Sequence, residues 1–240
     1  MNTVGKVNFT YDPLGRRLSK TLYTPKSYGW KLLDHEHYLY HDQNEIGAFN
    51  AKGTPKNLRV LGLGTSKNPT TIGIELEGRF FAPLLDIQAN IRRLIDLRYK
   101  SIASSYEFTA FGEDIQKNAK EKIVNPWRFA SKRLDPEFGL IYFGKRFYDP
   151  ECARWLTTDP AGFIDSANLY QYVFNNPFRY IDHDGRFISE IAQIGDDEWL
   201  ICPTCLDAWQ YNDDKDALVR CPKCLKVLNN PRYKNEYPHL

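Results

Sequence analysis

The chain has 240 residues, of which 42% are hydrophobic and 26% are charged, a composition typical of folded globular domains. Its formal net charge is only +2, so we do not expect it to bind nucleic acid or membranes through overall charge. No apolar run approaches the roughly 20 residues that cross a bilayer. Residues 1–10 lack a basic region followed by an apolar one, so we expect no secretory signal and consider a dedicated secretion system as the export route.

The aromatic content favours strands over helices. The sequence holds 15 Tyr and 14 Phe but a single Met, and aromatic side chains pack well on a pleated sheet. With 15 Gly and 14 Pro available for turns, the composition predicts a mainly β fold. Extended segments are expected at residues 7–12, 16–23, 37–42, 46–49, 58–64, 70–77 and 79–81.

The segment at residues 86–98 supports two interpretations. Its apolar residues recur near helical spacing, at positions 87, 91, 94 and 95. The segment is short, however, and fits equally well two strands joined by a turn at Gln88-Ala89-Asn90.

Four cysteines near the C-terminus form two pairs, Cys202-Pro-Thr-Cys205 and Cys221-Pro-Lys-Cys224. The 15 residues between the pairs lie in the range typical of a four-cysteine zinc site. Each pair can direct two thiolates at one ion, and two pairs complete a tetrahedron. We therefore predict a zinc ribbon with a structural Zn²⁺, since four cysteine ligands leave no open position for catalysis. The alternative is a set of redox-active or buried cysteines without a metal.

Residues 126–185 are dense in aromatic residues, arginines and Asp-Pro pairs, and their order resembles the RHS repeat-associated core domain of bacterial RHS/YD-repeat proteins. The matched elements are Arg128-Phe129, Leu134-Asp135, Gly139-Leu140-Ile141-Tyr142, Arg146-Phe147-Tyr148-Asp149-Pro150, Arg154-Trp155, Asp159-Pro160, Asn168-Leu169-Tyr170, Tyr172 and Asn176-Pro177. Residues 11–18, with the sequence YDPLGRRL, are similar to one YD repeat. Related proteins include the C components of insecticidal toxin complexes and the YD shell of teneurins.

The resemblance implies a division into three parts. Residues 1–124 would be a YD-repeat segment of a hollow β-shell, and residues 125–185 would be the core domain that plugs one end of it. Residues 186–240 would be the variable C-terminal domain, the position in which such proteins carry cargo. The charge supports a boundary between Gly185 and Arg186, because nine acidic and seven basic residues follow it.

In many family members the core domain cuts its own chain by aspartic-protease chemistry. The resemblance places the cleavage region at Asp182, Gly185, Arg186 and Phe187. The family pattern ends in Asp-Pro-x-Gly-Leu and is cut after the Leu. Here His183 replaces the Pro and Arg186 replaces the Leu, so the sequence leaves self-cleavage open.

The chemistry of self-cleavage requires two neighbouring carboxyl groups, one protonated and one that activates water. Our candidates are Asp149 and Asp159, each in an Asp-Pro turn. Arg146 and Arg154 would position this pair or stabilise developing charge. The alternative is that both aspartates cap turns through hydrogen bonds to backbone N–H groups.

The sequence therefore predicts the C-terminal part of an RHS/YD-repeat encapsulating shell with a zinc-ribbon tail in the cargo position. Its only enzymatic activity would be aspartic autoproteolysis near Arg186. The expected partners are the remaining shell chain or repeats, with an immunity protein or a secretion system as further candidates. Two alternatives stay open: the tail is a zinc-dependent effector or nucleic-acid-binding module, or the chain is a degenerate fragment of a longer RHS protein.

Overall fold

The computed structural model describes residues 4–62, 70–115, 123–163, 166–186 and 188–190, and four short strands further along the chain. The chain divides into two compact units, Met1–Ile191 and Ala192–Leu240. The boundaries predicted after residues 124 and 185 stay predictions.

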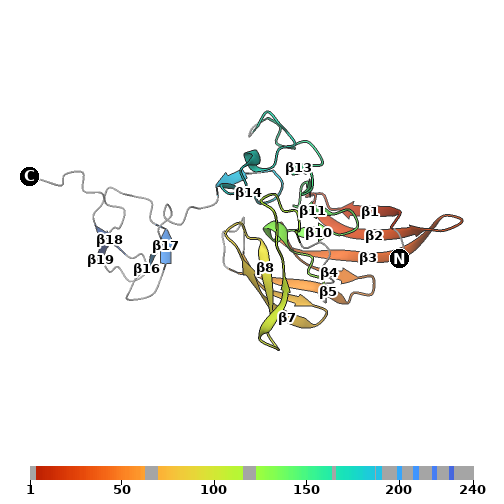
Figure 1. Ribbon diagram of the computed structural model, residues 1–240, viewed down its shortest axis with the longest axis horizontal. Coiled ribbons are helices and arrows are strands. Elements are labelled where there is room, and N and C mark those ends of the chain that lie inside the picture. The colour runs from red at the N-terminus through yellow and green to blue at the C-terminus, as the bar shows by residue number, and fades with distance from the viewer. Residues whose placement is uncertain are drawn as a thin grey trace, which may run out of the picture. The chain divides into compact units, whose positions relative to one another are not determined.

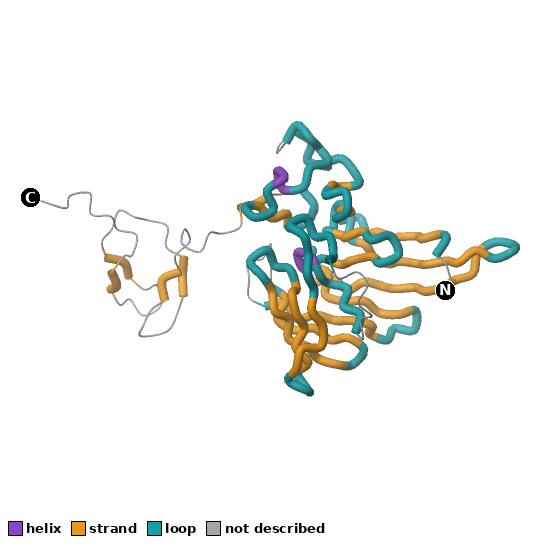
Figure 2. The backbone as a smooth tube through the Cα atoms, viewed as in Figure 1, coloured by secondary structure: helices purple, strands orange, loops and turns teal. Residues whose placement is uncertain are grey.

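The first unit contains a nine-stranded antiparallel sheet in which every strand pairs with the next one along the chain (Figure 1). Its strands are β1 (Lys6–Tyr11), β2 (Arg17–Pro25), β3 (Trp30–His41), β4 (Asn44–Asn50), β5 (Pro55–Leu61), β6 (Thr71–Leu76), β7 (Arg79–Leu85), β8 (Ile91–Asp96) and β9 (Ser101–Ser105). The predicted mainly β fold is confirmed. In the described residues helix occurs only as two short 3₁₀ turns, η1 (Phe129–Ser131) and η2 (Val173–Asn175) (Figure 2), and no helix there is long and apolar enough to cross a membrane.

Residues 86–98 form a turn and the strand β8, so the helical interpretation is wrong and the strand interpretation is confirmed. The Asp86 carboxylate accepts hydrogen bonds from the backbone N–H groups of Gln88 (3.0 Å) and Asn90 (2.9 Å). Ala89 has a positive φ of 61°, as a tight turn requires. The local turn chemistry of Asp86 therefore outweighs the spacing of the apolar residues.

The two faces of the nine-stranded sheet differ in burial. One face packs on a cluster that includes Phe81, Ile91, Leu94 and Trp127, all 0% exposed. The register of the strands places four exposed apolar side chains together on the opposite face, at Val60, Phe80, Leu84 and Ile102.

A second, four-stranded sheet follows: β10 (Arg133–Asp135), β11 (Leu140–Tyr142), β12 (Phe147–Asp149) and β13 (Arg154–Trp155). Farther along the chain, β14 (Tyr180–Asp182) pairs with β15 (Ile188–Glu190). Aromatic and aliphatic side chains from this region form one buried cluster, made of Phe129, Ala130, Ile141, Phe143, Tyr148, Trp155, Tyr172 and Val173.

Buried charges join the two sheets. Arg17 from the YD-like motif is fully buried, and its Nη1 lies 2.5 Å from the Asp135 carboxylate of β10. Lys20 Nζ approaches the other Asp135 oxygen at 3.2 Å. In the opposite direction, Arg133 of β10 reaches Glu45 of β4 at 2.6 Å. Since a buried charge is tolerated only with a partner, these pairs fix β10 against the larger sheet.

In the second unit, β16 (Trp199–Ile201) pairs with β17 (Ala208–Gln210), and β18 (Leu218–Arg220) pairs with β19 (Val227–Asn229). The four predicted zinc ligands, Cys202, Cys205, Cys221 and Cys224, lie outside the described residues. Zinc binding therefore stays a prediction.

Candidate functional site

Arg146 is the centre of the candidate site. It directly precedes β12, is 3% exposed, and its guanidinium lies 4.2 Å from the centre of the Trp155 ring. The backbone turns tightly here, since Gly144 has a positive φ of 118° and the Phe143 N–H bonds to the Arg146 carbonyl. Aromatic packing and this turn hold the long side chain in one orientation.

The Arg146 guanidinium brings together three segments of the chain. Its Nη2 lies 2.6 Å from Asp159 Oδ2 and 3.5 Å from Asp182 Oδ2. Its Nε donates a hydrogen bond of 2.5 Å to the Gly185 carbonyl. Two carboxylates and the predicted cleavage region thus share one buried cation.

Asp182, the last residue of β14, is 1% exposed. Its Oδ1 accepts hydrogen bonds from the backbone N–H groups of Asp184 (3.1 Å), Gly185 (2.7 Å) and Arg186 (3.2 Å). Its Oδ2 is buried and accepts no hydrogen bond within the described part of the chain. Burial raises the pKa of Asp182 to about 6, against the opposing effects of these N–H groups and of Arg146.

Asp159 occupies a different environment. Its Oδ1 accepts a hydrogen bond of 2.8 Å from the Ala161 N–H and so caps its own turn. Its Oδ2 forms an ion pair with Arg146 Nη2 at 2.6 Å. The site therefore joins one carboxyl that holds its proton to about pH 6 with one paired to a cation, the combination that acid–base catalysis requires.

The other two predicted catalytic residues lie apart from this cluster. Asp149 Oδ1 accepts backbone hydrogen bonds from Glu151 (2.9 Å) and Cys152 (3.1 Å), the turn-capping arrangement considered as the alternative. Arg154 is exposed and pairs with Asp149 across β12 and β13. Among the described residues, no hydrogen bond or ion pair joins Asp149 to Asp159.

The predicted cleavage region folds as a tight loop on Arg146. Gly185 has a positive φ of 85°, and a Cβ atom at this position would lie 3.0 Å from the Arg146 backbone nitrogen. Only glycine fits both conditions without a shift. Arg186 forms an ion pair of 2.6 Å with Asp184. Phe187 lies outside the described residues.

The position of Asp182 beside Arg146 was not predicted from the sequence, which placed Asp182 in the cleavage region and not among the candidate catalytic carboxylates. A signal was present, because an aspartate three residues before a glycine is typical of a side-chain-capped turn. Its proximity to Arg146 depends on a contact 36 positions along the chain, which spacing alone does not reveal. Among the described residues no group of three metal-ligating side chains occurs.

No protein-family model matches the sequence. Over 58 residues the chain is 50% identical to the toxin subunit YenC2 of Yersinia entomophaga, which covers 24% of this chain and 6% of that protein. It is also 30% identical over 111 residues to the tRNA nuclease WapA of Bacillus subtilis (strain 168), covering 44% of this chain and 5% of that protein.

Among solved structures, the crystal structure of TcdB2-TccC3-Cdc42 contains a chain that matches 75% of this one with a TM-score of 0.56. The identity is 24%, so this likeness shows a shared fold. The matched part is 9% of that chain, and the present chain spans less than a tenth of each of these three proteins.

Proposed function

From its homology to RHS/YD-repeat toxin proteins, which confirms the predicted resemblance, we propose that this chain is the C-terminal part of an encapsulating shell. The polypeptide that follows residue 186 is then the cargo. The remaining shell repeats are the partner that completes the enclosure.

The observation that carries this proposal is the nine-stranded antiparallel sheet, built by successive strands without a crossover. Such a sheet is a wall that further strands can extend at its edges. Its two faces support the same role. One is covered by the core domain, and the other exposes apolar side chains such as Phe80 (61%) that a polypeptide held beside the wall would cover.

Within this function, Arg146, Asp159 and Asp182 carry out one self-cleavage event. The Asp159 carboxylate takes a proton from water as the water oxygen attacks the carbonyl carbon of residue 186. Protonated Asp182 gives its proton to the amide nitrogen of residue 187 as the C–N bond breaks. The products are a carboxylate on Arg186 and a free amine on Phe187. Arg146 positions Asp159 through their ion pair and holds the loop through the Gly185 carbonyl.

Mass spectrometry of the denatured, expressed protein tests this step. The proposal predicts two fragments, residues 1–186 and 187–240, and a single intact chain for both Asp159→Asn and Asp182→Asn. Asp149→Asn is the matched control, because Asp149 also caps a turn but forms no hydrogen bond or ion pair with Arg146 among the described residues. Cleavage should be faster at pH 5 than at pH 7.5, since Asp182 must be protonated.

Two results would contradict the assignment. An intact wild-type chain at both pH values would exclude self-cleavage in this protein. Loss of cleavage in Asp149→Asn with cleavage retained in Asp182→Asn would instead support the pair predicted from the sequence.

For the tail we propose the structural zinc site formed by Cys202, Cys205, Cys221 and Cys224. The spacing of the two pairs supports it, and a unit of this size needs the folding energy that a metal supplies. Metal analysis of the purified full chain should give one zinc per chain, and Cys202→Ser should lower that ratio. A metal-free chain whose tail melts identically with and without chelator would exclude the site.

A further inference from the structure

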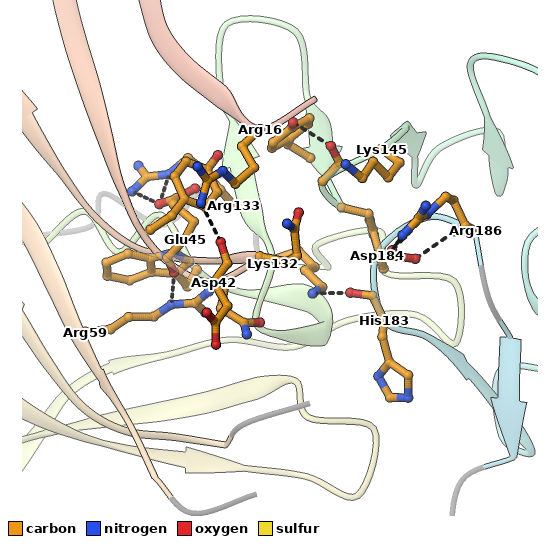
Figure 3. Close-up of a pocket in the computed structure, with 17 residues that line it drawn as sticks. Arg16, Asp42, Glu45, Arg59, Lys132, Arg133, Lys145, His183, Asp184 and Arg186 are labelled. Atoms are coloured by element: carbon orange, nitrogen blue, oxygen red, sulfur yellow. Dashed lines mark hydrogen bonds and ion pairs between the residues drawn. The ribbon is translucent and has the colours of Figure 1, made fainter. Parts of the chain in front are cut away.

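A cavity of about 310 Å³ is lined in part by His183, Asp184 and Arg186, which lie in the loop of the predicted cleavage region (Figure 3). Its walls come from the β3–β4 turn, from β5, from residues 132–133 and from residues 142–145. The side chains that line it include six cationic ones, Arg16, Arg59, Lys132, Arg133, Lys145 and Arg186. The three residues of the proposed cleavage reaction, Arg146, Asp159 and Asp182, do not line this cavity.

Three of these cations have no carboxylate partner among the described residues. Arg59 donates to the carbonyls of Glu45 (2.7 Å) and Ser131 (2.8 Å). Lys132 donates to the His183 carbonyl at 2.5 Å, as Figure 3 shows. Lys145 donates to a backbone carbonyl as well. Neutral carbonyls satisfy the donors but leave their charges uncompensated.

The acidic side chains of the lining are fewer and mostly engaged. Glu45 is paired with Arg133 at 2.6 Å, and Asp184 with Arg186 at the same distance. Asp42 is the third lining carboxylate, and Arg16 has its own partner in Asp12, outside the lining. The lining therefore has three cations without a carboxylate partner but only one carboxylate, Asp42, that is not paired with a lining cation.

Two further donors of the lining lack acceptors within the described part of the chain. The Nε1–H of Trp127, a side chain that is 0% exposed, has no hydrogen-bond partner, and neither does the hydroxyl of Tyr40. An indole nitrogen can only donate. The cavity is thus surrounded by an excess of positive charge and of hydrogen-bond donors.

The excess of positive charge around the cavity affects the pKa of Lys132. Burial, reinforced by the like charge of Arg59, lowers the pKa of Lys132 to about 8. The carboxylates of Asp182, Asp184 and Glu45 act in the opposite direction but do not offset it. A ligand of negative charge would raise the pKa of Lys132 and so stabilise its cationic form.

We propose that this cavity binds a phosphate group, held by Lys132 and Arg59. A phosphate carries a charge of about −1.5 to −2 at pH 7 and only accepts through its oxygens when fully ionised, which matches the surplus of cations over carboxylates better than a singly charged carboxylate does. The planar Arg59 guanidinium suits a tetrahedral oxyanion. The site requires only the phosphate group, whether it is free in solution or part of a small molecule.

Isothermal titration of the intact full chain with inorganic phosphate tests the proposal. The chain is kept whole with the Asp159→Asn background, so that failure of the self-cleavage proposal does not affect the result. We expect saturable binding of one phosphate at pH 7 and at least about tenfold weaker binding of acetate. At pH 8.5 binding should take up protons, seen as a heat that depends on the ionisation enthalpy of the buffer, because the ligand restores the charge on Lys132.

Two variants make the test specific. Lys132→Met should weaken phosphate binding at least about tenfold, and Lys132→Arg should retain it if the charge matters. Lys52→Met is the matched control, because it removes the same charge from an exposed turn and should bind like the parent. Absence of saturable binding at millimolar phosphate, or equal loss in Lys52→Met and Lys132→Met, would overturn the proposal. If Lys132→Met does not fold, the proton uptake of the parent chain at pH 8.5 tests the proposal instead. Phosphate binding without proton uptake would exclude Lys132 as a ligand.

Discussion

Two buried arginines organise the first unit, and their surroundings differ in one respect. Arg17 ties β2 to Asp135, whose two carboxylate oxygens are both occupied, one by Arg17 and one by Lys20. Arg146 reaches Asp182, whose Oδ1 accepts three backbone hydrogen bonds while its Oδ2 accepts none in the described residues.

The aromatic surroundings are similar in the two cases. The Arg17 guanidinium lies 4.3 Å from the centre of the Tyr142 ring, and that of Arg146 lies 4.2 Å from the centre of the Trp155 ring. The two arginine–carboxylate pairs therefore differ in whether both oxygens of the carboxylate have donors. A fully occupied carboxylate holds two sheets together, while a buried oxygen without a donor favours a proton.

The largest effect should come from breaking the structural pair. Arg17→Ala leaves Asp135 buried without its closest cation, so we expect the free energy of unfolding to fall by about 3–5 kcal/mol. Urea titration followed by fluorescence would measure it. The neighbouring Arg16→Ala is the control, since Arg16 is partly exposed and should contribute no more than about 1 kcal/mol. Equal effects of the two substitutions would contradict the distinction.

A second prediction concerns the pH dependence that Asp182 imposes. The folded chain keeps the Asp182 proton to about pH 6, whereas the unfolded chain loses it near pH 3.9. The free energy of unfolding should therefore fall as the pH rises from about 4 to about 6, by about 3 kcal/mol from this group. Other carboxylates add their own slopes, so the measurable quantity is the difference between the wild type and Asp182→Asn in urea titrations over this range. Parallel curves for the two proteins would contradict the raised pKa.

A third prediction tests the close approach of the loop to Arg146. Gly185→Ala places a Cβ 3.0 Å from the Arg146 nitrogen at a positive φ, so we expect a loss of about 1–3 kcal/mol and slower self-cleavage. Gly139→Ala is the matched control, because Gly139 also has a positive φ but no atom lies within 4 Å of its added Cβ. The difference in melting temperature between the two variants measures the effect of the close approach of residue 185 to Arg146. Identical melting temperatures would exclude that close approach.

The smallest effect is expected at Asp149, the capped turn without a buried cation. Asp149→Ala removes two backbone hydrogen bonds near the surface and should lower the free energy of unfolding by about 1 kcal/mol. Urea titration at pH 7 beside the wild type is the check. A loss as large as that of Arg17→Ala would contradict the interpretation of Asp149 as a surface turn cap.

The sequence predicted local structure better than the site. Alternating residues and turn formers located most of the strands of the larger sheet, because period-two burial and turn chemistry are properties of short segments. The strand at residues 101–105 was missed, since its sequence, SIASS, has almost no apolar alternation. The choice for residues 86–98 depended on Asp86, whose hydrogen bonds to its own turn decided the outcome.

For the candidate site, the sequence predicted Asp149 and Asp159 as the catalytic pair, whereas the structure brings Asp159 to Arg146 and leaves Asp149 in a separate turn. The two aspartates share the same Asp-Pro signature, and nothing local distinguishes a capped turn from a turn that faces a cation. Asp182 reaches Arg146 only through the folding of β14 against the core, a contact between distant positions. The buried link from Arg17 to Asp135 was missed for the same reason.

If the proposed self-cleavage occurs, the pairing of β14 with β15 has a consequence for the release of the tail. Three residue pairs, Tyr180 with Glu190, Ile181 with Ser189 and Asp182 with Ile188, lie on either side of the loop that contains the bond after residue 186. Cleavage of that bond would break the connection between β14 and β15 but leave the hydrogen bonds between the two strands in place. After cleavage the tail would stay bound through the β14–β15 pairing. The separation of these two strands, and not the cleavage itself, would then set the time at which the tail is released.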